Sequence, residues 1–145
     1  MNKPTNEFTG EDDSVLETDW WVVDIPPEWI VEQEDDSVLI GDADGVGVIE
    51  ISTLLAESAD TGGPDTEALF SQLSPVPGRA TQLAGLPGLY ATFEDDDQHV
   101  RQWCVGNSKL VLVVSYCCDP DDAGMDDSAV DAILDTLSIA TALLD

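Results

Sequence analysis

The chain is short of positive charge. Lysine and arginine together number four among 145 residues, whereas aspartate and glutamate number 31, so the formal net charge is −27 at pH 7. Proteins bind DNA, RNA and anionic lipid surfaces largely by neutralising phosphate groups with lysine and arginine. The composition therefore predicts no nucleic acid and no membrane surface among the partners of this protein.

Long apolar runs are absent as well. No stretch approaches the roughly 20 apolar residues that span a bilayer, and the segment from Met1 to Glu7 lacks the apolar core of a secretory signal. These features predict a cytoplasmic protein. Apolar residues make up 43% of the chain and include four tryptophans, which is enough for a real core. We expect a flexible acidic arm over residues 1–14 and a single domain over residues 15–145.

Histidine and cysteine are also scarce. His99 is the only histidine, and Cys104, Cys117 and Cys118 form an odd set without the spacing of a disulfide framework. Neighbours on a strand face opposite ways, so Cys117 and Cys118 cannot act as a pair on one face. We expect three reduced, structural thiols, no metal ion and no catalytic residue.

Two glycine-containing turns invite a comparison with ligand-binding loops. The segment Asp42-Ala43-Asp44-Gly45 resembles the start of a calcium loop, but it lacks a third oxygen ligand before the glycine, and Thr53 stands where a bidentate glutamate is needed. The segment Gly85-Leu86-Pro87-Gly88 lacks the lysine and the following helix of a phosphate loop. We interpret the first segment as a hairpin turn and expect no cofactor.

The acidic excess has three interpretations: adaptation to a salty cytoplasm, complementarity to a basic protein partner, or solubility alone. The acidic runs extend through the whole chain, whereas a dedicated binding patch would be confined to one face. They include Glu11-Asp12-Asp13, Glu34-Asp35-Asp36, Asp95-Asp96-Asp97 and Asp126-Asp127. This distribution favours solvent adaptation.

The apolar pattern predicts an α+β fold. Alternation and β-branched residues indicate strands over residues 20–25, 37–41, 47–52, 89–93, 99–105 and 110–118, and helical spacing indicates helices over 66–73 and 126–138. Residues 110–114 are apolar on both faces, as a central, covered strand requires. Pro26-Pro27-Glu28-Trp29 is interpreted as a rigid corner. We expect a central, mostly antiparallel sheet of five to six strands flanked by helices.

The turn at residues 106–109 sets the pairing of the strands around it. If this turn is tight, positions whose numbers sum to 215 face each other, so that His99 lies opposite Tyr116 and Arg101 lies opposite Val114. His99 and Arg101 then share one face of the sheet.

Three polar side chains near this hairpin could carry chemistry. Cys118 would lie diagonal to His99, a geometry that permits a nucleophile pair, although no motif supports one. Arg79 and Arg101 are rare cations, and we expect each to pair with carboxylates in a structural ion pair. An anion-binding role for them is the alternative.

Trp20 and Trp21 are the best candidates for an interaction surface. Adjacent residues on a strand face opposite ways, so one indole points away from the covered face of the sheet or lies beneath the N-terminal arm. An exposed tryptophan is a favoured interface anchor. Together with His99 and Arg101, the two tryptophans form the predicted set of protein contacts.

The order of elements resembles a known superfamily. The strand from Trp21 into Pro26-Pro27-Glu28-Trp29 and the closing segment Ile133-Leu134-Asp135-Thr136-Leu137-Ser138-Ile139 are similar to the two ends of the PsbP-like superfamily. The resemblance covers residues 17–140 and implies a PsbP-like α/β/α sandwich. Members include photosystem extrinsic subunits, Mog-type Ran-binding proteins and chaperones for type VI secretion effectors, which are binding and assembly modules and generally not enzymes.

These observations predict a non-catalytic protein-binding or assembly module with a halophile-like acidic surface. Two alternatives stand beside it. The first is an immunity protein or secretion-effector chaperone that binds a basic or nascent protein; the second is a small enzyme with paired polar groups in a pocket. The sequence leaves the partner and the oligomeric state open.

Overall fold

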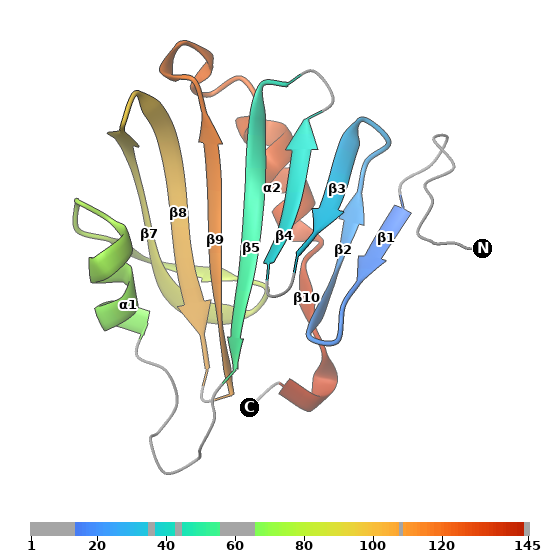
Figure 1. Cartoon of the computed structure of the whole chain (residues 1–145). Helices are drawn as coiled ribbons and strands as arrows, with labels where there is room; N and C mark the ends of the chain where they lie inside the picture. The colour runs from blue at the N-terminus through green and yellow to red at the C-terminus, as the bar shows by residue number, and fades with distance from the viewer. Residues whose placement is uncertain (1–13, 35–36, 43–44, 56–65, 108, 144–145) are drawn as a thin grey trace.

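The computed structural model describes residues 14–34, 37–42, 45–55, 66–107 and 109–143. The N-terminal arm predicted over residues 1–14 lies outside this part except for Ser14. The elements, in chain order, are β1 (Ser14–Glu17), β2 (Trp21–Ile25), β3 (Trp29–Gln33), β4 (Ser37–Asp42), β5 (Gly47–Leu55), α1 (Thr66–Leu73), β6 (Arg79–Leu83), β7 (Leu86–Asp95), β8 (Gln98–Gly106), β9 (Leu110–Cys118), α2 (Asp127–Asp135) and β10 (Ser138–Ile139) (Figure 1). Two short 3-10 helices follow β9 and β10, at Pro120–Asp122 and Thr141–Leu143.

The strands form two antiparallel sheets. The larger has seven strands in the order β3-β4-β5-β9-β8-β7-β6, and the smaller has three in the order β1-β2-β10. The α+β class is confirmed, but the expectation of five to six strands in one sheet is wrong. β3 and β6, which the sequence analysis did not assign, extend the large sheet at its two edges, and β1 and β10 pair with β2 as a second sheet.

Strand β9 is the centre of the large sheet. It pairs with β5 on one side and β8 on the other, and Leu110, Val111 and Leu112 are buried. A strand that is covered on both faces has no polar alternation, which explains the continuous apolar run. In β5, Ile49 and Ile51 are buried while Glu50 is exposed, as the alternation predicts.

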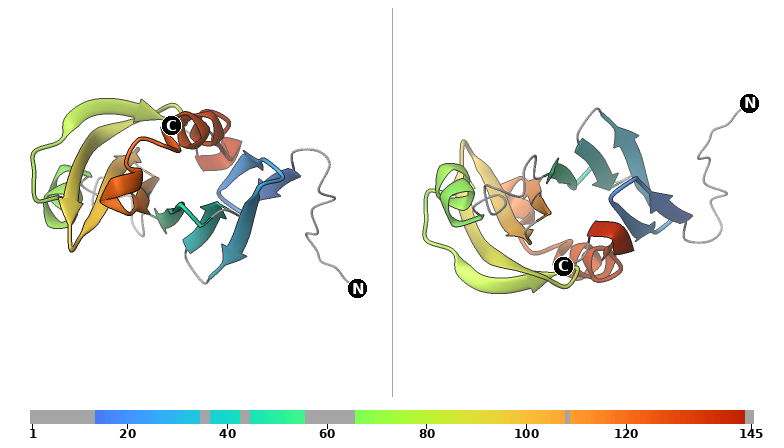
Figure 2. Two further views of the ribbon diagram at one scale, coloured as in Figure 1. Left: turned by 90° about the horizontal axis from the view of Figure 1, so that it is seen from above. Right: turned by 90° about the horizontal axis from the view of Figure 1, so that it is seen from below.

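Two different layers cover the large sheet. On one face of the large sheet, which we call the inner face, buried side chains of α2 and of β2 pack against the sheet. The smaller sheet lies beside α2 (Figure 2). On the outer face, Phe70 of α1 packs with Ala91, Cys104 and Val111. The predicted sandwich with purely helical outer layers is therefore too simple, because the inner face is covered by a helix and a small sheet together.

Helix α2 is shorter than its apolar spacing suggests. The helix ends at Asp135 instead of residue 138, and Ser138 and Ile139 pair with Val22 and Trp21 as β10. Asp126 is the N-cap residue, yet its carboxylate makes no capping hydrogen bond. Tyr116 donates its hydroxyl to that carboxylate at 3.1 Å.

The predicted register of the β8–β9 hairpin is wrong by two positions. His99 pairs with Cys118 and Arg101 with Tyr116, so paired numbers sum to 217. The turn is longer than assumed because Asn107 organises it: its side-chain oxygen accepts hydrogen bonds from the backbone N–H groups of Lys109 and Leu110. A shift of two preserves the face of every side chain, so His99 and Arg101 still share one face.

Within the described part of the chain, no helix is long and apolar enough to cross a membrane. At the turn predicted after Asp42, the Gly45 N–H donates to the Asp42 carbonyl at 2.8 Å. Gly45 has a φ of +79°, the left-handed conformation that glycine adopts readily. Residues 43 and 44 of that segment lie outside the described residues.

Candidate protein-binding site

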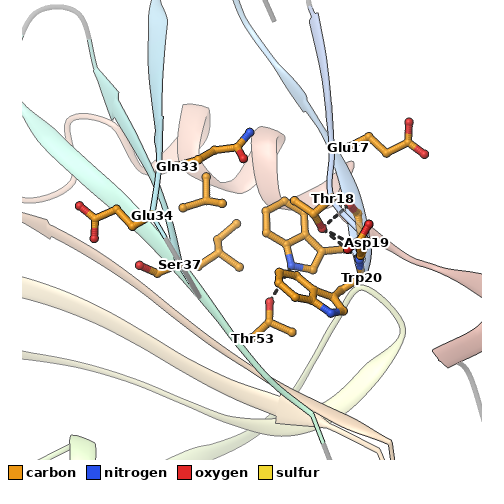
Figure 3. A pocket seen from close by; sticks show the side chains of 11 residues that line it. Glu17, Thr18, Asp19, Trp20, Gln33, Glu34, Ser37 and Thr53 are labelled. Carbon is orange, nitrogen blue, oxygen red and sulfur yellow. Dashed lines mark hydrogen bonds between the residues drawn. The ribbon is translucent and has the colours of Figure 1, made fainter. Parts of the chain in front are cut away.

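A cleft of about 260 Å³ opens beside the tryptophan pair (Figure 3). One wall is formed by the end of β1 and the turn between β1 and β2, the other by the end of β3 with Glu34 and the start of β4, and β5 contributes to the floor. The lining residues are Glu17, Thr18, Asp19, Trp20, Trp21, Gln33, Glu34, Ser37, Val38, Ile51 and Thr53. None of these is a lysine, arginine or histidine.

Trp21 forms the rigid base of the cleft. Its side chain is 1% exposed, and its indole N–H donates to the Thr53 hydroxyl at 2.9 Å. A buried indole N–H needs such a partner, because an unsatisfied donor costs about 1–3 kcal/mol. Thr53 is itself buried. The structure thus places Trp21 in the core, where it supports the cleft and joins the small sheet to β5.

Trp20 faces the cleft from a backbone that is fixed on both sides. The Thr18 hydroxyl accepts hydrogen bonds from the N–H groups of Trp20 and Trp21 at 3.1 and 3.0 Å, and the Trp20 carbonyl accepts one from the Ala140 N–H at 2.8 Å. The indole is half-buried against the core. Of the predicted tryptophan contacts, Trp20 is therefore the one that a partner can touch.

Three exposed carboxylates lie along the rim of the cleft, and Figure 3 shows those of Glu17 and Glu34 pointing away from the indoles. Glu17 is the last residue of β1, Asp19 lies in the turn between β1 and β2, and Glu34 directly follows β3. Figure 3 shows Glu34 on one side of the cleft and Asp19 and Glu17 on the other. Negative charge on both walls with aromatic and aliphatic surface between them suits a long side chain with a positive end.

Arg101 belongs to a different cluster, between the large sheet and α2. Its Nε donates to the Tyr90 hydroxyl at 2.9 Å, and its two terminal nitrogens donate to Asp127 at 3.4 Å and Asp131 at 2.9 Å. The guanidinium also lies 4.7 Å from the ring centroid of Trp103. The predicted pairing of Arg101 with carboxylates is confirmed.

Arg101 acts as a clamp that holds α2 on the sheet. The residue is 8% exposed. Burial alone would lower its pKa, but the hydrogen bonds with Tyr90 and Asp131 outweigh that effect and raise it. A cation so fully engaged has little surface for a partner, although it borders a pocket of about 250 Å³ between β6 and α2. Arg79, in β6, is exposed.

His99 and Cys118 are direct partners in the register, not diagonal neighbours as predicted. His99 is half-buried, and its Nε2 lies 3.4 Å from the Thr92 hydroxyl. Cys118 is a free, buried thiol, and burial raises its pKa, which disfavours the thiolate nucleophile. Among the described residues there is no group of three histidine, cysteine, aspartate or glutamate side chains that could hold a metal ion.

Most of the cleft could not be predicted from the sequence. The tryptophan pair stood out there, but Glu17, Asp19 and Glu34 did not, because they lie near the ends of β1 and β3, which only the fold brings together. Neither strand was predicted. The available signal was the pair of acidic residues just before the tryptophans, Glu17 and Asp19.

Comparison with known proteins identifies the fold. No family model and no curated protein matches the chain, whereas solved structures do. The chain is similar to a protein from Bacteroides thetaiotaomicron VPI-5482, with a TM-score of 0.63, 16% identity and 84% of this chain covered. The chain spans 46% of that protein, or about half its length.

Two smaller proteins are similar over most of their length. Cyanobacterial PsbP (CyanoP) from Synechocystis sp. PCC 6803 aligns over 95% of this chain and 100% of its own, with a TM-score of 0.59 and 10% identity. LpqN of Mycobacterium tuberculosis, which is involved in cell envelope biogenesis, aligns over 91% and 87%, with a TM-score of 0.54 and 16% identity. The chain therefore has a PsbP-like fold, as the order of elements predicted. Identities this low show the fold alone.

Proposed function

We propose that the protein is a non-catalytic protein-binding or assembly module of the cytoplasm, and that the cleft at Trp20 receives a lysine or arginine side chain from its partner. One observation carries the proposal: a half-buried tryptophan lies between carboxylates on both walls of a cleft without a cation in its lining. Because the PsbP-like fold alone does not define a function, the proposal rests on this cleft.

The chemistry of the cleft suits both ends of a basic side chain. Its aliphatic stem would lie on the half-buried indole of Trp20, and the charged group would lie between the walls that carry Glu34 and Asp19. A cation over an indole contributes about 0.5–1 kcal/mol at an exposed site and about 2 when it is desolvated. A single side chain therefore binds weakly, and a stable complex needs a larger interface around it.

The charge of the whole molecule supports a basic partner. A formal charge of −27 attracts a positive protein over long distances and speeds its association, particularly at low ionic strength. This observation also favours the second candidate function, an immunity protein or effector chaperone, because both would bind a basic or nascent cargo. A toxin or effector gene beside the gene of this protein would support that candidate.

The cleft can be tested with a blocked pentapeptide that carries one lysine between glycine and serine residues, titrated while the indole N–H signals are followed by NMR. We expect the Trp20 signal to shift and the buried Trp29 signal to stay. A peptide with norleucine in place of lysine keeps the aliphatic stem without its charge and should leave both signals unchanged.

Variants sharpen the test. Glu34→Gln and Asp19→Asn should each weaken the lysine peptide several-fold, whereas Glu28→Gln, an exposed carboxylate at the β2–β3 corner, should not. Equal shifts with the lysine and norleucine peptides would show that charge is not recognised, and the proposed cleft would then be wrong.

A further inference from the structure

The chain after α2 forms a strap, residues 136–143, that runs along β2 toward Trp20 (Figure 1). At its start the Thr136 hydroxyl accepts a hydrogen bond from the Asp24 N–H at 2.9 Å and donates one to the Ile133 carbonyl of α2 at 2.7 Å. Strand β10 of the strap then pairs with the first two residues of β2. The strap is therefore tied to both the helix and the small sheet before it reaches Trp20.

The strap meets Trp20 at its backbone. The Ala140 N–H donates to the Trp20 carbonyl at 2.8 Å, and the Ala140 carbonyl accepts from the Leu143 N–H at 2.8 Å within the 3-10 turn that follows. The lining of the Trp20 cleft includes no residue of the strap. The strap thus holds Trp20 without occupying the space that a partner side chain would enter.

Asn107, in the turn between β8 and β9, fixes the far end of the strap to the large sheet. Its Nδ2 donates to the Leu143 carbonyl at 2.9 Å, and its Oδ1 accepts from the backbone N–H groups of Lys109 and Leu110. Leu143 is also partly buried against the core. One side chain therefore organises the turn and holds the strap, with a different atom for each task.

The position of Trp20 depends on supports from outside β2. Trp20 lies in the bend before that strand, where its N–H donates to the Thr18 hydroxyl at 3.1 Å and its carbonyl accepts from Ala140. If the Ala140 bond opened, the support on the carbonyl side would be lost. The half-buried indole, which the cleft presents to a partner, could then leave its place against the core.

We propose that the strap is a brace that sets the position of the Trp20 indole and thereby the affinity of the cleft, with Asn107 as its positioning residue. The proposal rests on the function proposed above for the cleft. A partner binds with full affinity only to molecules in which the indole is in place, so a loosened strap raises the observed Kd. By linkage, a bound partner must in turn hold the strap more firmly.

Two substitutions loosen the strap at different points. Asn107→Asp keeps an oxygen for the turn but replaces the donor to Leu143 with an oxygen that repels the carbonyl. Ala140→Pro removes the N–H that holds Trp20. Loss of one hydrogen bond shifts a local equilibrium by about two- to tenfold, so we expect each variant to raise the Kd of the lysine pentapeptide by about threefold or more. The extra charge of Asn107→Asp would by itself favour a basic peptide, so charge cannot cause this loss.

The matched control is Thr141→Pro. It places proline at an exposed first position of the 3-10 turn, where proline is tolerated, and it keeps the Ala140 N–H. We expect wild-type affinity from this variant. Should Ala140→Pro fail to fold, the comparison of Asn107→Asp with wild type carries the test.

Hydrogen exchange separates a brace from a segment that only stabilises the fold. In the wild type, saturating lysine peptide should slow the exchange of the Ala140 amide. The Ser74 amide, which donates to the Phe70 carbonyl at the end of α1, should keep its rate. A strap that only stabilises the fold would lower the midpoint of urea unfolding in Asn107→Asp without any response of Ala140 to the peptide.

Three outcomes would overturn the brace: wild-type affinity in both loosened variants, an equal loss in Ala140→Pro and Thr141→Pro, or an Ala140 amide that does not respond to bound peptide. A wild-type protein that does not bind the peptide would refute the cleft instead. The brace is then judged in the free protein, where Asn107→Asp and Ala140→Pro must shift the Trp20 indole signal and Thr141→Pro must not.

Discussion

Replacing Arg101 with methionine should destabilise the fold markedly. The substitution keeps the apolar stem but removes hydrogen bonds at 2.9 Å to Tyr90 and to Asp131, a longer one to Asp127 and the contact with the Trp103 ring. Breaking a buried ion pair costs about 3–5 kcal/mol, but the side chains of Asp127 and Asp131 are 46% and 55% exposed and can be rehydrated. We therefore expect a loss of about 2–3 kcal/mol in the free energy of unfolding.

The matched control for this experiment is Arg79→Met. It makes the same chemical change and the same change in net charge at an exposed position of β6, so its effect should stay within about 0.5 kcal/mol. Urea unfolding followed by tryptophan fluorescence measures both variants, and Arg101→Lys should lie between them because lysine cannot span Tyr90 and two carboxylates. Equal stability of the two methionine variants would refute the clamp.

Two further predictions concern salt and thiol reactivity. The melting temperature should rise steeply between about 0.1 and about 2 M KCl, because the Debye length falls from about 10 Å at 0.1 M to about 3 Å at 1 M; a flat response would remove solvent adaptation as the explanation of the charge. Burial raises the pKa of Cys104 from 9.0 to about 11, which lowers its thiolate fraction at pH 8 by about two orders of magnitude, so that Ellman's reagent should modify the half-buried Cys117 before Cys104 in the folded protein. All three thiols should react at once in guanidinium chloride, and rapid modification of Cys104 in the native state would contradict its burial.

The elements that the sequence predicted are those whose signals are local. The helix over residues 66–73 has the predicted bounds. The strands that begin at residues 37 and 47, β4 and β5, pair as the predicted hairpin. In each case the apolar spacing and the turn residues point to the same structure. The central position of β9 followed from the same kind of evidence, since its apolar run has no polar alternation.

The elements that the sequence missed depend on distant partners. Strand β3 begins two residues after Pro27, and Trp29 is its only buried residue, so its pattern alternates too weakly to be distinguished from the predicted proline corner. Strand β10 has two residues, which pair with β2 more than a hundred positions away. The register of β8 and β9 depended on the side chain of Asn107, whose hydrogen bonds lengthen a turn that composition alone describes as tight.

For the candidate contact residues, too, the local features could be predicted from the sequence and the distant partners could not. Arg101 was expected to pair with carboxylates, and the ion pairs exist, but the identity of Asp127 and Asp131 as partners required the position of α2. The prediction that Trp20 and Trp21 face opposite ways is wrong, because Trp20 lies in the bend before β2 and both tryptophans line the same cleft. Which of them is available to a partner depended on Thr53, a residue of β5 that holds the Trp21 indole.

The position of Arg101 also bears on how an acidic protein can bind anything in a salty medium. With this cation buried in its clamp, an approaching partner meets a surface of carboxylates, and salt screens their attraction for basic groups at the same time as it relieves their mutual repulsion. Binding that depends on charge alone should therefore weaken under the conditions in which the fold is most stable.

Apolar contacts are not screened in this way. The proposed cleft combines carboxylates with an apolar anchor, the half-buried Trp20 indole. If the acidity is an adaptation to salt, the affinity of the partner should depend mainly on that anchor.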